Sequence, residues 1–142
     1  MMNDERPHVW SLTEELNMQI VNRWAEAIRA GLKNVDGSGA DVVVGSETIK
    51  SVRTAQKVGE ELRRAGCRSI VMCYNVWNFP YLVWPFVNSL GRDIPILSLS
   101  NNNGQYPGNV GLLATDGGLR QAGVRTHRIV GEMDDPACRQ KV

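Results

Sequence analysis

The stretch Ser69-Ile70-Val71-Met72-Cys73-Tyr74-Asn75-Val76-Trp77-Asn78-Phe79-Pro80 decides the fold. Its first part, residues 69–72, is an apolar run typical of a buried strand. Its second part, residues 73–80, is a turn rich in aromatic and amide side chains. A helical pattern begins directly after it. A strand that ends in such a turn is where an open α/β sheet usually places its ligand, so this turn is the first candidate for a binding surface.

Strand and helix patterns alternate on both sides of this stretch. The expected order is helix 11–33, strand 41–44, a helix capped by Gly45-Ser46, strand 69–74, helix 80–90, strand 94–100, helix 107–122 and strand 125–130. The first helix carries a capping box from Ser11 to Glu14 and an apolar residue at every fourth position.

Short apolar strands that alternate with helices predict a parallel sheet covered by helices on both faces. We therefore expect an α/β domain with a Rossmann- or flavodoxin-like three-layer α-β-α architecture and a mainly parallel sheet of four to five strands. The length of 142 residues fits one domain. This domain is expected to span residues 1–132. Residues 133–142 show no pattern and are expected to form a flexible tail or the start of a linker to a further domain.

The helix expected over 107–122 has an unusual composition. It contains four glycines, Gly108, Gly111, Gly117 and Gly118. They weaken a helix intrinsically and would be tolerated if it lies unusually close to a neighbouring element. The residues expected to point inward are Val110, Leu113, Ala114 and Leu119.

Composition and charge argue against several classes of protein. The formal net charge is +1, and no basic patch is interleaved with aromatic residues, so nucleic-acid binding is not expected. No apolar run approaches the length of a membrane span, and the polar N-terminus lacks the apolar region of a secretion signal. Cys67, Cys73 and Cys138 do not form a C-x-x-C pair and are expected to be reduced thiols of a cytoplasmic protein.

The loops after the expected strands carry polar and aromatic groups. Three of them, residues 45–48, 74–80 and 101–106, should meet at the carboxyl edge of the sheet. Amides, hydroxyls and a flat indole suit a neutral, polyhydroxylated ligand. Trp77 lies on a loop with polar neighbours, so we expect it to have a ligand or interface role.

Several residues in or near these loops also fit purely structural roles. Asn101 to Asn103 fit an ordinary loop, because asparagine favours turns. Trp84 fits a core position of a helix, and Glu47 fits an acid in the first turn of a helix. His8 and His127 have no acid or cysteine at metal-ligand spacing, and no glycine-rich phosphate motif or Ser-His-Asp set is present. The residues alone thus predict an uncharged surface at the strand ends that is suited to binding a sugar, without a complete set of catalytic residues.

Three runs of the chain resemble the N-terminal part of L-fucose isomerase-like proteins, a group related to the L-arabinose isomerases. These runs are residues 69–77, 94–99 and 111–123. Arg6-Pro7 is also similar to an Arg-Pro pair that precedes the family's first helix. The resemblance covers most of positions 5–132. It implies a cytoplasmic aldose–ketose isomerase acting on sugars such as L-fucose or D-arabinose, with Mn²⁺ as cofactor and proton transfer through an enediol.

The resemblance also implies which parts of the complete enzyme hold the metal and which contact the sugar. The metal ligands and proton-transferring acids come from later parts of a longer chain, so this segment has no catalytic or metal-binding residue and is expected to be inactive alone. In the family, a tryptophan of this turn reaches the sugar in a neighbouring subunit of a hexamer, which points to Trp77, with Asn75 and Tyr74 as further candidates. An arginine before the first helix also approaches the sugar, which points to Arg6.

The expected partners are therefore an aldose or ketose and the neighbouring subunits of a homo-oligomer. Two alternatives remain open. One is a non-catalytic module that binds a sugar or nucleotide through the same loops. The other is a purely structural oligomerisation domain, in which Trp77 and Trp84 would lie at subunit contacts.

Overall fold

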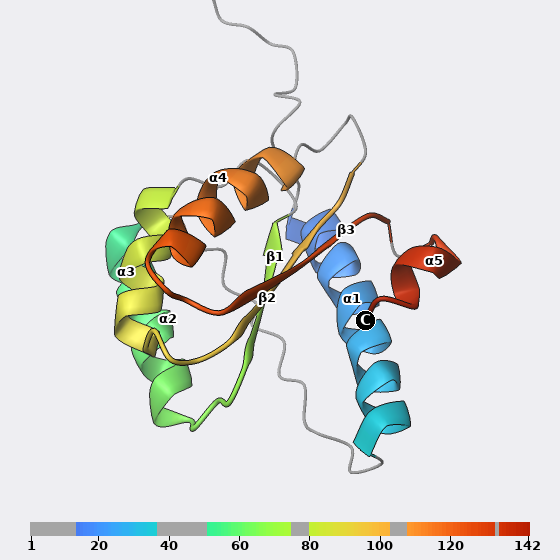
Figure 1. Ribbon diagram of the computed structural model, residues 1–142, viewed down its shortest axis with the longest axis horizontal. Coiled ribbons are helices and arrows are strands. Elements are labelled where there is room, and N and C mark those ends of the chain that lie inside the picture. Colours follow the sequence, from blue (N-terminus) through green and yellow to red (C-terminus); the bar gives the residue numbers. More distant parts are fainter. Residues whose placement is uncertain (1–13, 37–50, 75–79, 103–107, 133) are drawn as a thin grey trace, which may run out of the picture.

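The computed structural model describes residues 14–36, 51–74, 80–102, 108–132 and 134–142 (Figure 1). The elements follow one another in the order α1 (Glu14–Asp36), α2 (Val52–Arg64), β1 (Ile70–Tyr74), α3 (Pro80–Leu90), β2 (Ile96–Ser100), α4 (Gly108–Gln121), β3 (Thr126–Val130) and α5 (Pro136–Arg139). The predicted alternation of helices and strands from residue 69 to residue 130 is confirmed. The strand expected at 41–44 lies outside the described residues.

The described strands form one parallel sheet in the order β1-β2-β3. Ile70 of β1 pairs with Ile96 of β2, which pairs in turn with Thr126 of β3. An α/β domain with a parallel sheet flanked by helices is therefore confirmed. Within the described ranges the sheet has three strands, where four to five are expected from the sequence.

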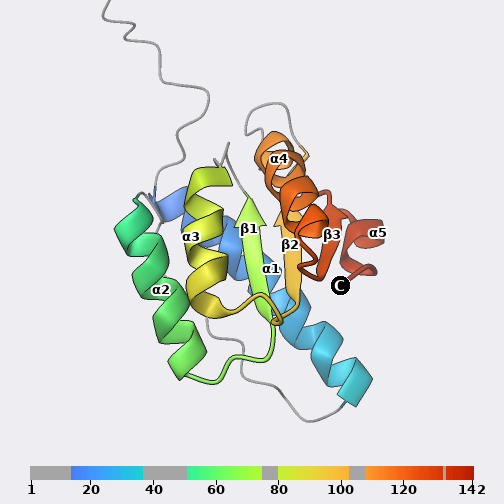
Figure 2. The same cartoon turned by 60° about the vertical axis from the view of Figure 1, so that its left-hand side comes forward.

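Each face of the sheet has its own apolar core. On one face Ile70 and Ile96 pack against α2, α3 and α4, whose buried residues there are Ala55, Val83, Phe86, Val87, Leu90 and Leu119. On the other face Leu99 and Ile129 pack against Trp24 and Ile28 of α1 and Cys138 of α5. Figures 1 and 2 show the sheet between α1 on one side and α2, α3 and α4 on the other. The alternation of side chains along each strand produces this division.

Helix α2 begins later than the sequence suggests. Its N-cap is Ser51, whose hydroxyl accepts the N–H of Thr54 at 3.1 Å. The expectation that Gly45-Ser46 caps this helix is therefore wrong. Ser46 and Ser51 are both residues that can cap a helix, so residue type does not distinguish the two positions.

The orientation of α4 also corrects an expectation. Val110, Leu113 and Ala114 are exposed, while the inward face consists of Gly108, Gly111, Leu112, Thr115, Asp116 and Leu119. Of the residues expected to point inward, Leu119 alone does so. Gly108 on the inner face allows the start of the helix to lie against the end of β1, and this close approach favours burial of the stripe that contains it.

The C-terminal segment contains structure where the pattern predicts a flexible tail. The carboxylate of Asp135 accepts the N–H of Ala137 at 2.9 Å and caps α5, with Pro136 in its first turn. Cys138 is buried in the core beside α1, and Val142 packs against the same core. A helix of four residues is too short to show a periodic pattern. The domain boundary near residue 132 stays a prediction.

The three cysteines carry free thiols, as expected. Burial raises the pKa of Cys73 to about 12, so this thiol stays protonated at neutral pH. None of the described helices is long and apolar enough to cross a membrane.

Candidate functional site at the carboxyl edge of the sheet

Four residues were candidates for contact with a sugar, and the structure describes one of them. Tyr74 ends β1 and is 1% exposed. Its hydroxyl points back along the strand and donates to the sulfur of Met72 at 3.8 Å. Asn75, Trp77 and Arg6 lie outside the described residues. A contact between any of these residues and a sugar stays a prediction.

A group of buried polar side chains surrounds the Tyr74 hydroxyl. Burial raises the pKa of Tyr74, and the nearby Asp116 carboxylate raises it further, whereas the hydroxyls of Ser98 and Thr115 lower it. The net shift is upward, so Tyr74 is a neutral phenol at physiological pH. It cannot serve as a general base there. Its buried side chain lies at the end of β1, from which residues 75–79 continue in the sequence.

Helix α4 begins directly against the carboxyl ends of β1 and β2. The side-chain oxygen of Asn101, a buried residue just after β2, accepts the N–H of Gly108 at 3.2 Å. A Cβ atom on Gly108 would overlap the carbonyl oxygen of Tyr74 and would lie 2.6 Å from Asn101 Oδ1. Only glycine permits this contact. Asn101 and Gly108 thus hold the start of α4 against the ends of β1 and β2, and Asn101 has a structural role.

Two exposed polar residues form the described surface of this edge. The carboxylate of Glu132 accepts the backbone N–H of Asn102 at 2.7 Å. The N–H of Gly131 donates to the carbonyl of Ser100 at 3.0 Å, which also ties the ends of β2 and β3 together. Glu132 was missed in the sequence because 30 positions separate it from Asn102. The rule that parallel strands end at one edge could have brought the two residues together.

A buried ion pair joins α4 to β3. Asp116 is fully buried, and its Oδ2 lies 3.3 Å from Nε of Arg120 and 3.3 Å from Nε of Arg128. Arg120 also donates to the hydroxyl of Thr126 at 2.9 Å and to its carbonyl at 3.2 Å. These contacts hold the helix on the sheet below the carboxyl edge.

The described residues do not form a metal site. No group of three or more histidine, cysteine, aspartate or glutamate side chains that could hold an ion occurs among them. His127, the described histidine, is exposed on β3. The part of the chain seen here does not fit a Mn²⁺ site.

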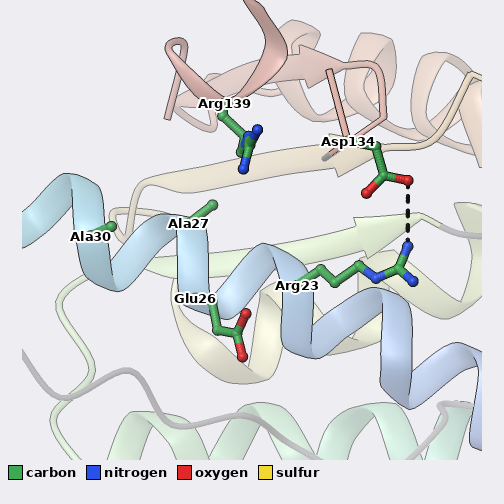
Figure 3. Close-up of a pocket in the computed structure, with 6 residues that line it drawn as sticks. All are labelled: Arg23, Glu26, Ala27, Ala30, Asp134 and Arg139. Carbon is green, nitrogen blue, oxygen red and sulfur yellow. Dashed lines mark ion pairs between the residues drawn. The ribbon is translucent and has the colours of Figure 1, made fainter. Parts of the chain in front are cut away.

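A pocket of about 360 Å³ lies on the opposite face of the sheet, between α1 and the segment around α5. Figure 3 shows its lining residues, which are Arg23, Glu26, Ala27, Ala30, Asp134 and Arg139. Arg23 and Asp134 form an ion pair at 3.6 Å across one end. The charged side chains are all exposed, so the pocket is typical of a groove between surface helices and we assign it no role.

The chain is similar in sequence to known proteins. Residues 1–141 match the family model described as L-fucose isomerase, first N-terminal domain. The chain is 27% identical over 137 residues to an L-fucose isomerase from Bacteroides thetaiotaomicron, and the match covers 86% of this chain and 21% of that protein. The chain therefore spans about a fifth of the length of this relative. No solved structure gives a significant match.

Proposed function

The chain belongs to the L-fucose isomerase family as a first N-terminal domain, and from this premise we propose that it is the N-terminal part of a metal-dependent aldose–ketose isomerase. The family match over residues 1–141 carries the proposal. The substrate would be a sugar of the L-fucose or D-arabinose type, and the enzyme would be a cytoplasmic homo-oligomer. Residues outside this domain would hold Mn²⁺, which polarises sugar oxygens when bound.

Within such an enzyme, we propose that the domain supplies a binding surface for the sugar. The turn that follows Tyr74 would place the Trp77 indole against the apolar face of the sugar ring, where it would orient the substrate. Asn75 and Arg6 would donate hydrogen bonds to its hydroxyls. The described neighbours support a binding role, because exposed Asn102 and Glu132 add an amide and a carboxylate to the same edge.

The first prediction concerns tryptophan fluorescence during a titration of the chain with L-fucose. We expect the emission of the parent chain to change and to saturate, and we expect the Trp77→Phe variant to lose most of that change. Trp24→Phe is the matched control, because Trp24 of α1 is buried in the core between that helix and the sheet. A Trp77→Phe response equal to that of the parent would remove this turn from the site.

A separate observation favours an additional role in subunit contact. Between positions 108 and 119 the outward face of α4 has no charged side chain, with Val110 42% and Leu113 50% exposed and Asp116 buried. The charged Arg120 follows in the last turn of the helix. The adjacent α3 contains no charged residue, and its Tyr81 is 60% exposed. Exposed apolar surfaces of this kind mark interaction sites. We propose that α3 and α4 contact a second copy of this chain.

The second prediction tests this contact by sedimentation velocity over a range of protein concentrations. The parent chain should associate, and Leu113→Glu should raise the dissociation constant at least about tenfold, because a buried charge costs more than 1.4 kcal/mol. Val52→Glu is the control, since Val52 is also substantially exposed (41%) but lies on α2. A parent chain that stays monomeric would rule out the proposed interface. So would an equal change in the dissociation constant for Leu113→Glu and Val52→Glu.

A further inference from the structure

Four polar side chains meet beneath α4, where bulk water does not reach them. They are Tyr74 of β1, Ser98 of β2, and Thr115 and Asp116 of α4, and none is more than 1% exposed. Side chains of this kind are normally placed in a protein interior only when each one forms hydrogen bonds.

The register of the sheet explains why these groups come together. Met72, Ser98 and Arg128 are paired across the three strands and form one row on the α4 face. The Tyr74 hydroxyl reaches back over this row to the sulfur of Met72. At the other end of the row Arg128 contacts Asp116 at 3.3 Å. The row therefore brings hydroxyls from two strands to the inner face of α4.

Most of these groups lack a hydrogen bond. The hydroxyl oxygens of Ser98 and Thr115 and both carboxylate oxygens of Asp116 have no partner in hydrogen-bond geometry. The two arginines contact Asp116 Oδ2 as ion pairs and not as hydrogen bonds. The Ser98 and Thr115 hydroxyls lie close enough to Tyr74 to lower its pKa by hydrogen bonding, although neither has a partner in strict hydrogen-bond geometry. A bridging molecule would satisfy them together.

We propose that this cluster binds an ordered water molecule that bridges Asp116 Oδ1 to the hydroxyls of Tyr74, Ser98 and Thr115. The carboxylate and hydroxyl groups of this cluster determine which ligand can bind there. It must donate to a carboxylate and accept from a hydroxyl, so it carries both a donor and an acceptor. The nearby guanidinium groups of Arg120 and Arg128 disfavour a cation, and the carboxylate disfavours an anion. Water is the small neutral molecule that buried polar groups of this kind bind.

The bound water would connect α4 to two strands of the sheet at once. Tyr74 lies at the end of β1 and Ser98 in the middle of β2, and both would be joined through the water to a helix that is also paired to β3 through Asp116 and Arg128. The site would therefore help to fix α4 on the sheet. This inference does not depend on the proposed function.

The variants Tyr74→Phe and Thr115→Val test the proposal in urea unfolding of the 142-residue chain. If the hydroxyls hold a water, each variant lowers the folding equilibrium constant about 5- to 30-fold. The double variant then loses less than the product of the two effects, because both residues share one ligand. Thr115→Ser keeps the hydroxyl and should behave like the parent. If the Thr115 hydroxyl has no partner, Thr115→Val should leave the constant unchanged or raise it, which would overturn the proposal.

A high-resolution crystal structure of the parent chain gives a second test that does not require any variant to fold. Electron density for a water within about 3.2 Å of Asp116 Oδ1 and of one of the three hydroxyls would support the site. Direct hydrogen bonds from Ser98 or Thr115 to Asp116, with no water density between them, would overturn it.

Discussion

Replacing Gly108 by alanine is expected to lower the free energy of unfolding by about 3 kcal/mol or more, at or above the upper end of the usual cost of overpacking. The added Cβ would overlap the carbonyl oxygen of Tyr74, which is backbone and cannot rotate away. It would also press on Asn101, whose side chain bonds to the Gly108 N–H. The start of α4 would have to move away from the sheet edge, and both contacts would be weakened.

Gly117→Ala in the same helix is the matched control for this experiment. A Cβ atom on Gly117 has nothing within 4 Å, and the residue is exposed. Alanine should therefore stabilise the chain by up to about 1 kcal/mol, because glycine is a poor helix former. Urea unfolding of both variants measures the difference. Equal effects would mean that the backbones of α4 and β1 are not in close contact at Gly108.

The second large effect is expected when both arginine partners of Asp116 are removed. Asp116 is 0% exposed, while the side chains of Arg120 and Arg128 are 50% and 39% exposed. An ion pair between exposed residues would contribute about 0–1 kcal/mol. Here one partner is buried, so the double variant Arg120→Gln/Arg128→Gln leaves a buried carboxylate without a cation. We expect it to lose about 3–5 kcal/mol of stability at pH 7.

Removing the carboxylate should cost less than removing its partners. The half-exposed arginines can be hydrated when Asp116→Asn takes their counter-ion away. Adding Asp116→Asn to the double arginine variant should therefore recover much of the lost stability. Urea unfolding of the single, double and triple variants measures this coupling. A double variant as stable as the parent would show that these contacts behave as ordinary surface pairs.

The sequence predicted the elements with strong local signals. The apolar runs that became β1 and β2, and the helix over Pro80–Leu90, follow from patterns within a few residues. The idea that the glycines of α4 allow close approach is confirmed at Gly108 but not at Gly117, which faces open space. The composition of α4 allows either of two faces of the helix to point toward the sheet. The choice depended on backbone contact with β1, and no periodicity within the helix contains that information.

Features that depend on distant pairs could not be predicted in this way. The pairing of Asp116 with Arg128 and of Asn102 with Glu132 requires the register of β2 and β3. The short α5 helix forms because Cys138 is buried beside α1, a contact between opposite ends of the chain. The residues expected to contact a sugar depended on the family resemblance, and three of the four lie outside the described part of the chain.

The central claim is that the carboxyl edge of the sheet is a sugar-binding surface. Amide resonances of the ¹⁵N-labelled 142-residue chain, recorded during a titration with L-fucose, test it most directly. If the sugar binds at this edge, the resonances of the turn around Trp77 and of Tyr74, Asn102, Gly108 and Glu132 should shift. Arg23 and Arg139, which line the pocket beside α1, should not shift. Shifts confined to that pocket, or no shifts at any sugar concentration, would show that the carboxyl edge does not bind the sugar.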